Sequence, residues 1–346
     1  MRAVLVPLDA DPVLPDPASR PHGLAGTSMG TGWSARLMLP PALASGPDGD
    51  LRGALQRELD GIVAQMSHWD PGSLLSRYNR APGGSWHALP PQFFAVMDYA
   101  LSVFDDSGGA YDPAAGALVN LWGFGPVGRY DQAGFYAPAA GAVAAVLAQA
   151  REGRPVLDRE GRRLLQPGGA VLDLSSVAKG YAVDCLARRL EALGVGHYLV
   201  EVGGELRGAG VKGDGQPWWV ELEGVPDAAD AAGAAAAPAP QAVVALHGLA
   251  VATSGDYRRY FHHARRRASH TLDPRTGSPV DNGVASVTVL APDCMAADAL
   301  STALTVMGAE AGLAFAEGRH LAARFLLREG GGLREVHSPA WRALLQ

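Results

Sequence analysis

Apolar residues recur at helical spacing in the first third of the chain. Between Leu51 and Met66 they fall at steps of three or four residues, at Leu55, Leu59 and Ile62. This spacing places them on one side of a helix, because 3.6 residues make a turn. The stretch therefore predicts a helix that buries one apolar face.

A second helix is expected to begin at Pro91, because proline is favoured at the first helical position. Its inward residues are expected to be four apolar ones: Phe94, Met97, Leu101 and Phe104. Short apolar runs, several of them rich in β-branched residues, predict strands at residues 197–202, 205–211, 218–222, 242–246, 249–252 and 284–290.

One stretch, residues 171–184, combines an expected strand, a turn and a helix start. Val171 to Leu174 predicts a short buried strand that carries Asp173 at its end, and Ser175 and Ser176 offer hydroxyls for a helix N-cap. Apolar residues then follow at helical spacing as far as a glycine suited to a left-handed C-cap: Val183, Leu186, Leu190, Leu193 and Gly194. A helix start of this kind is a site for phosphate.

Lys179 lies in the first turn of that predicted helix, where its charge opposes the helix dipole. A bound anion would explain a cation at this position. An ion pair with Asp173 or Asp184 would explain it equally well, and the stretch by itself does not separate the two interpretations.

A second group of polar residues lies on the helix predicted after Asp293. Asp298 and Thr302 are four residues apart and therefore share a helix face, with Ser301 beside them. Carboxylate, hydroxyl and carbonyl oxygens suit a hard cation such as magnesium. A hydrogen-bonded polar patch is the alternative. The spacing of Cys and His predicts no zinc site, and no Walker or dinucleotide-binding glycine pattern occurs.

Composition excludes several classes of protein. The chain has 346 residues, of which 48% are hydrophobic and 18% charged, and its net charge of −6 argues against nucleic acid as a partner. Only Cys185 and Cys294 are present, so no disulfide framework is expected. No apolar run approaches membrane-spanning length, and neither a secretory signal nor a lipid-anchor cysteine is visible, which predicts a cytoplasmic protein without membrane insertion.

Domain organisation is predicted from composition and from the spread of the candidate residues. Residues 1–24 are rich in Pro and Asp and are expected to form an extended N-terminal arm on the surface. Residues 25–346 are expected to form a single domain, with a low-complexity insertion of Ala and Pro at 224–241.

Eight segments, in order, resemble the FAD:protein FMN transferases, known as the ApbE family. They include M-S-H-W-D-P-G-S-L-L-S-R-Y-N and V-A-K-G-Y-A-V-D, and they span residues 29–31, 66–79, 110–125, 172–184, 202–204, 253–257, 270–280 and 298–308. The resemblance implies an α+β fold of mixed, mostly antiparallel sheets flanked by helices, an ApbE-like (T-fold-like) architecture. It implies a magnesium-dependent enzyme that cleaves FAD, attaches FMN through a phosphoester to a threonine of a target flavoprotein and releases AMP.

The resemblance also implies roles for particular residues. Flavin contacts are implied at Met29, Trp69, Ala110, Tyr111, Asp112, Asp173, Lys179 and Leu272. Magnesium ligands are implied at Ser176 and Ser301 through their carbonyls, and at Asp298 and Thr302. His270 matches the proposed base, and Asp173 is assigned to catalysis with it. From its place in the same turn, three residues after His270, Asp273 is the candidate to orient the imidazole, and a role in the turn alone is the alternative.

Two other functions share these residues. One is a magnesium-dependent FAD pyrophosphatase that yields FMN and AMP, and the other is a non-catalytic FAD-binding protein. The expected partners are FAD and an acceptor flavoprotein with a Ser/Thr-rich flavinylation motif. No such motif is found in this chain, so the acceptor is expected to be a different one.

Overall fold

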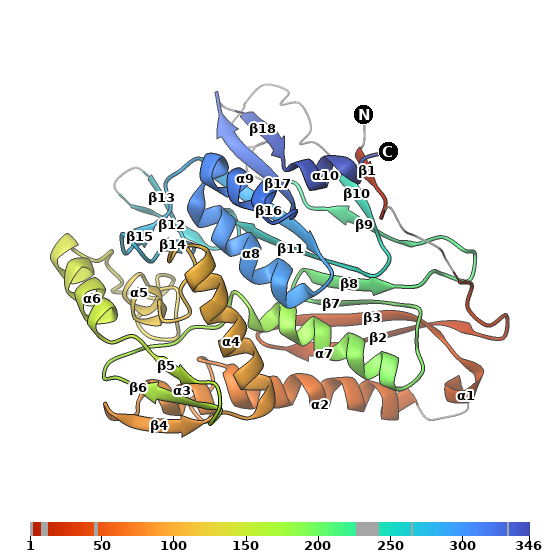
Figure 1. The fold of residues 1–346 in the computed structure, drawn as a ribbon, viewed down its shortest axis with the longest axis horizontal. Helices are drawn as coiled ribbons and strands as arrows, with labels where there is room; N and C mark the ends of the chain where they lie inside the picture. Colours follow the sequence, from red (N-terminus) through yellow and green to blue (C-terminus); the bar gives the residue numbers. More distant parts are fainter. Residues whose placement is uncertain (1–2, 8–12, 45–47, 226–241, 264–265, 331) are drawn as a thin grey trace.

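An eight-stranded antiparallel sheet forms the centre of the protein (Figure 1). The computed structural model describes residues 3–7, 13–44, 48–225, 242–263, 266–330 and 332–346. In spatial order the strands of the sheet are β18 (Gly332–His337), β17 (Ala322–Glu329), β16 (Val284–Ala291), β11 (Leu249–Gly255), β8 (Glu205–Ala209), β7 (Tyr198–Val202), β3 (Thr31–Leu39) and β2 (Arg20–Ser28). Each neighbouring pair is antiparallel.

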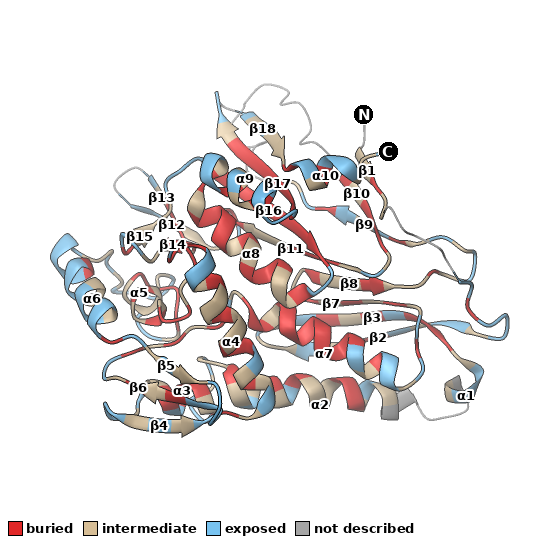
Figure 2. Ribbon diagram, viewed as in Figure 1, coloured by how far each residue is buried: buried red, intermediate tan, exposed pale blue. Residues whose placement is uncertain are grey.

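Helices cover one face of this sheet. The two that lie at its middle and contact each other are α7 (Ala178–Ala192) and α8 (Cys294–Met307). Around them lie α2 (Asp48–Met66), α4 (Pro91–Asp106) and α9 (Ala309–Gly318). Figure 2 shows buried residues concentrated along α7 and α8. The expected apolar face of α2 is confirmed, because Leu55, Leu59, Ile62 and Met66 are buried.

A smaller sheet covers part of the opposite face. It consists of β1 (Ala3–Leu5), β10 (Ala242–Leu246) and β9 (Trp218–Leu222), and α10 (Pro339–Ala343) packs beside it. Val251 and Leu290 of the large sheet pack into this second layer, whereas their neighbours Ala252 and Val289 face α8 and α9. Strand β16 is consequently buried along its whole length, as expected for a strand covered on both faces.

Most of the remaining elements form a separate layer beside α4, on the left of Figure 1. Its helices are α3 (Leu74–Asn79), α5 (Gly116–Leu121) and α6 (Ala140–Glu152), and its three-stranded sheet is β4 (Ser85–Ala88), β6 (Arg163–Gln166) and β5 (Val156–Asp158). Two hairpins are β12 (Tyr260–His263) with β13 (Arg266–Ser269) and β14 (Leu272–Asp273) with β15 (Ser278–Pro279). A short helix, α1 (Pro41–Ala44), follows β3.

The predicted α+β class with mostly antiparallel sheets is confirmed. The expected surface arm over residues 1–24 is wrong at both ends. Ala3–Leu5 pairs in parallel with β10 and buries Leu5 completely, because even three apolar residues can extend a sheet edge. Strand β2 begins at Arg20, and Pro21 is tolerated there because β2 is an edge strand.

Two further expectations concern the low-complexity insertion and membrane-spanning helices. The low-complexity insertion lies mostly outside the described residues, which end at Val225 and resume at Ala242. Over the described ranges, no helix combines the length and the apolar character needed to cross a membrane.

Candidate active site

Most of the predicted site residues line one pocket of about 320 Å³. They come from strands, loops and helices far apart in the chain: Met29, Ala110, Tyr111, Asp112, Asp173, Ser176, Lys179, His270, Leu272, Asp298 and Thr302. Two predicted residues, Trp69 and Ser301, lie next to the pocket walls rather than in them.

Met29 enters the pocket from a strained turn. Met29 and Gly30 join β2 to β3, and both have positive φ, 53° and 72°. Two consecutive positive φ values define the tight hairpin turn that matches the twist of antiparallel strands. Glycine adopts this conformation freely, but methionine rarely does. The turn therefore holds Met29 in an unfavourable backbone conformation while its side chain lines the pocket.

Asp298 is fixed by the crossing of α7 and α8. Its side chain is buried, and Oδ2 accepts a hydrogen bond of 2.9 Å from the backbone N–H of Gly180. A Cβ atom at position 180 would lie 2.2 Å from the carbonyl oxygen of Cys294, so only glycine allows this approach. Burial raises the pKa of Asp298, although the nearby charge of Lys179 acts in the opposite direction.

Lys179 pairs with Glu205, a residue that neither sequence interpretation named. Its ammonium group donates to Glu205 Oε1. Burial by itself lowers the pKa of Lys179, but attraction to Asp298 and Glu205 outweighs it and the pKa is raised. Asp184 instead accepts from Arg207 and from the backbone N–H groups of Cys294 and Met295. The alternative interpretation of Lys179, an ion pair with Asp173 or Asp184, is therefore wrong in its partner.

Glu205 is an unusual carboxylate, because it lies in the pocket wall and is almost fully buried. Burial raises its pKa to about 7, with the Lys179 charge lowering it and Asp298 raising it further. Its second oxygen, Oε2, is buried and has no hydrogen-bond partner in the described part of the chain. Such an atom normally has a partner, so a water molecule or a bound group is expected to donate to it.

The segment before α7 differs from the expectation. Residues 171–174 form only an isolated bridge, between Val171 and Ala115, and not a strand. The helix begins at Ala178, and neither serine caps it. The Ser175 hydroxyl and its backbone N–H donate instead to Asp173 Oδ1, over 2.5 and 2.8 Å. A local turn around Asp173 has therefore replaced the predicted N-cap.

His270 is held by backbone contacts to Arg259. Its N–H donates to the Arg259 carbonyl over 2.9 Å, and Nδ1 lies 3.2 Å from the same oxygen. Because a carbonyl only accepts, Nδ1 carries the proton and Nε2 keeps a lone pair. Asp273, the candidate to orient this ring, accepts instead from the backbone N–H and the guanidinium of Arg275, which agrees with the alternative of a role within the turn. Burial, reinforced by the charges of Arg259 and Lys179, lowers the pKa of His270 to about 4.

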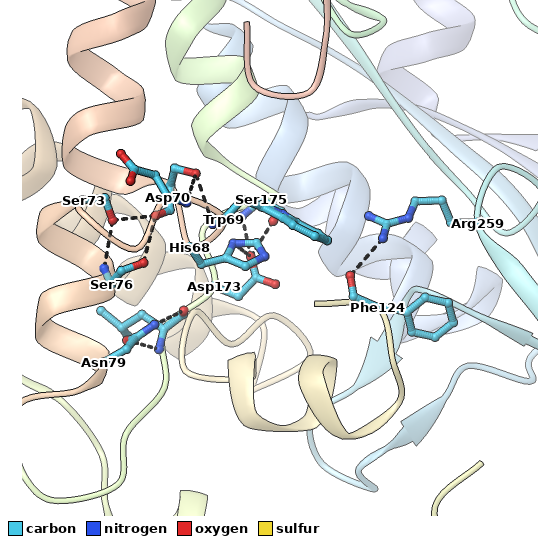
Figure 3. Close-up of polar contacts among 12 residues, drawn as sticks. His68, Trp69, Asp70, Ser73, Ser76, Asn79, Phe124, Asp173, Ser175 and Arg259 are labelled. Carbon is cyan, nitrogen blue, oxygen red and sulfur yellow. Dashed lines mark hydrogen bonds and ion pairs between the residues drawn. The ribbon is translucent and has the colours of Figure 1, made fainter. Parts of the chain in front are cut away.

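Trp69 lies at the edge of the site with 43% of its surface exposed. The guanidinium carbons of Arg129 and Arg259 lie 5.7 and 5.9 Å from its ring centroid, close enough for cation–π attraction. Figure 3 shows the indole pointing from its loop toward Arg259. The predicted flavin contact of Trp69 stays a prediction.

The oxygen groups around Asp298 fit a hard cation. The Ser254 hydroxyl lies 2.9 Å from both the Ser301 and the Thr302 hydroxyls, and Thr302 and Asp298 line the pocket. Among the described residues no group of three or more His, Cys, Asp or Glu side chains could hold a metal. A cation here would thus need hydroxyl and carbonyl oxygens as well as Asp298, which is the ligand chemistry of magnesium rather than of zinc.

Comparison with known proteins places the chain in a family. A model of the ApbE family matches residues 29–325. The FAD:protein FMN transferase of Klebsiella pneumoniae (strain 342) is 36% identical over 335 residues, which cover 95% of this chain and 91% of the relative. That of Vibrio cholerae (serotype O1, strain ATCC 39541 / Classical Ogawa 395 / O395) is 36% identical over 330 residues, covering 95% and 94%.

Solved structures agree with this assignment. The crystal structure of the Pseudomonas stutzeri flavinyl transferase ApbE in its apo form matches with a TM-score of 0.82 and 36% identity, covering 94% of this chain and 97% of that one. The flavin transferase ApbE from Vibrio cholerae matches with a TM-score of 0.82 and 32% identity, covering 94% and 100%. The chain belongs to the ApbE family, and the resemblance drawn from its sequence is confirmed.

Proposed function

We propose that this protein is an FAD:protein FMN transferase. In the reaction, the hydroxyl oxygen of an acceptor threonine attacks the phosphorus of the FMN half of FAD. A new P–O bond forms, the P–O bond to the AMP half breaks, and AMP leaves. The observation that carries the proposal is that residues from Met29 to Thr302, expected to contact flavin, phosphate and metal, line a single pocket.

The proposed metal ligands are Asp298, Thr302 and the carbonyl of Ser176, and these three residues line the pocket. When bound there, magnesium would offset the negative charge of the pyrophosphate and polarise its oxygens. The fourth expected ligand, the carbonyl of Ser301, has weaker support. That oxygen accepts a hydrogen bond of 2.8 Å from the Thr305 hydroxyl within α8.

Other residues of the pocket are proposed to bind the pyrophosphate, to accept the proton and to contact the flavin ring. Lys179, at the start of α7, offers its ammonium to the pyrophosphate, and Glu205 keeps that ammonium in the pocket. His270 is neutral near pH 7 because its pKa is low. Its Nε2 lone pair is therefore free to take the proton of the acceptor hydroxyl, which is a poor nucleophile until it loses that proton. Met29, Tyr111 and Leu272 supply apolar surface for the isoalloxazine ring.

The acceptor is proposed to be a separate flavoprotein with a Ser/Thr-rich motif. That this protein acts in the cytoplasm stays a prediction. The function is tested by incubating the protein with FAD, magnesium and a threonine-bearing acceptor, and then looking for flavin fluorescence that survives a denaturing gel. Covalent flavin on the acceptor supports the proposal. Flavin that always separates from the acceptor on denaturation contradicts it.

A further inference from the structure

His68 makes its polar contact with the pocket carboxylate Asp173. It lies in the loop between α2 and α3, and its Nδ1 is 3.3 Å from Asp173 Oδ1. Both side chains are nearly buried, with 11% and 12% of their surface exposed. The other ring nitrogen, Nε2, is buried and has no hydrogen-bond partner among the described residues. Among the described residues, Asp173 is therefore the polar partner of the His68 ring.

The two oxygens of Asp173 have different surroundings. Oδ1 accepts from the Ser175 hydroxyl and N–H and also faces His68. No hydrogen bond from the described part of the chain reaches Oδ2. Because Asp173 lines the pocket, Oδ2 is the oxygen left to accept from a bound substrate.

The loop that carries His68 is bonded to the start of α3, and the end of α3 is bonded to the segment before Asp173. The Ser73 and Ser76 hydroxyls donate to the Ser67 carbonyl, over 2.5 and 3.2 Å. At the end of α3 the Asn79 amide exchanges two hydrogen bonds with the backbone of Leu172, over 2.9 and 2.8 Å. Leu172 directly precedes Asp173, so α3 links the His68 loop at its start to the segment that bears the carboxylate at its end; Figure 3 draws the bonds at both places.

Trp69 packs beside His68. Its ring centroid lies 5.3 Å from that of His68. Figure 3 shows the indole beside the imidazole, on the side toward Arg259. Because only 11% and 12% of the His68 and Asp173 side chains are exposed, the local dielectric is low, which strengthens the attraction between the imidazole and the carboxylate.

We propose that His68 is a positioning residue for FMN transfer. It holds Oδ1 of Asp173 away from the pocket, so that Oδ2 faces FAD and accepts from a hydroxyl or N–H of the flavin half. The inference rests on the proposed function, in which Asp173 contacts that half of FAD. It differs from a purely structural role, because it requires the effect of His68 to pass through Asp173.

The test compares His68→Leu, which removes the ring nitrogens, with His68→Asn, which keeps an N–H donor near the Nδ1 position. The matched control is His87→Leu. His87 is another partly buried histidine, with Nε2 2.9 Å from the Ser85 hydroxyl, and it lies in β4 outside the pocket. Single-turnover transfer rate, FAD dissociation constant and melting temperature are measured for each variant.

His68→Leu is expected to lose roughly tenfold or more in transfer per folded molecule, since small displacements of substrate-positioning groups have effects of this order. His68→Asn is expected to recover most of the loss, and His87→Leu to transfer at the wild-type rate. In an Asp173→Asn background, His68→Leu is expected to add little, because the two residues act through one contact.

Wild-type transfer by folded His68→Leu, or an equal loss with Asp173→Asn present, would overturn the inference. Wild-type transfer by Asp173→Asn alone would instead contradict the role of Asp173 in the proposed function. If His68→Leu does not fold, His68→Ala replaces it as the variant without ring nitrogens and is compared with His68→Asn in the same way.

Discussion

The backbone N–H of Gly180 donates to Asp298 Oδ2, and this one hydrogen bond joins the start of α7 to the carboxylate face of α8. It exists because position 180 has no side chain. A Cβ atom there would meet the Cys294 carbonyl at 2.2 Å and Asp298 Cβ at 2.8 Å. The packing of the two central helices and the geometry of the candidate metal site therefore depend on the same residue.

Gly180→Ala is expected to destabilise the protein by about 1–3 kcal/mol, the usual effect of overpacking a core. It is also expected to weaken magnesium-dependent transfer, because α7 and α8 must separate. Urea unfolding and a magnesium titration measure the two effects. The control is Gly141→Ala in α6, where an added Cβ meets no atom within 4 Å. That control is expected to gain up to about 1 kcal/mol from helix propensity. Equal stability changes in the two variants would contradict the steric argument.

Asp298→Ala is expected to abolish transfer at ordinary magnesium concentrations while the fold persists. Asp298→Asn keeps an oxygen that can accept from Gly180 but lacks the charge that attracts the cation. It is expected to retain more stability than Asp298→Ala and to need far more magnesium for transfer. If either variant shows the wild-type magnesium dependence after chelation and back-titration, Asp298 is not a ligand.

Lys179→Met is expected to weaken FAD binding by roughly 1.5–3 kcal/mol, the range for a hydrogen bond to a charged group. The pairing with Glu205 adds a second effect. Removing Lys179 leaves a buried carboxylate without its partner, which also lowers stability.

The double variant Lys179→Met/Glu205→Gln separates these effects. It is expected to recover stability without recovering FAD affinity. Calorimetric binding and denaturant unfolding on the single and double variants provide both quantities. Full FAD affinity in the double variant would reduce Lys179 to a structural partner of Glu205.

Features that depend on residues close together in the sequence could be predicted, whereas features that depend on contacts between distant segments could not. The apolar face of α2 and the left-handed Gly194 after α7 follow from spacing within single helices. In α4 the buried face is rotated by about one residue, to Phe93, Val96, Ala100 and Val103 beside Met97. Which side of an apolar helix turns inward is decided by its neighbours, and periodicity alone does not specify them.

The partners of the charged site residues could not be predicted from the sequence either, because they come from distant parts of the chain. Lys179 meets Glu205 because the turn at Gly203 and Gly204, both with positive φ, returns the chain into β8 beside α7. Lys179 itself was identified because a cation at a helix start breaks a local rule. His68 breaks no local rule, and only the folded chain places it beside Asp173.

His270→Ala is expected to lower single-turnover transfer by about 10²–10⁴, the usual effect of removing a general base. FAD and magnesium affinity should change little. A loss of tenfold or less, or a parallel loss of FAD affinity, would assign His270 to the scaffold. The orienting group is the Arg259 carbonyl, so Asp273→Asn should leave the rate nearly unchanged.

The low pKa of His270 also predicts a pH dependence of stability. In the unfolded chain the imidazole takes up a proton near pH 6.5, whereas in the folded protein it does so near pH 4. Between these values the unfolded state binds more protons, so stability falls as pH decreases through this window. His270→Asn is expected to flatten the decline by up to about 3 kcal/mol, measured by urea unfolding at pH 7 and pH 4. An unchanged decline would show that His270 does not stay neutral in the folded protein.

The central claim is that the pocket moves FMN from FAD to an acceptor threonine and does not simply hydrolyse FAD. The most direct measurement follows AMP release and the intact mass of the acceptor in one reaction. The proposed transferase predicts one AMP for each acceptor that gains FMN, and no modification once the acceptor threonine is replaced by alanine. AMP released at the same rate without acceptor, with the acceptor mass unchanged, would contradict it and identify a pyrophosphatase.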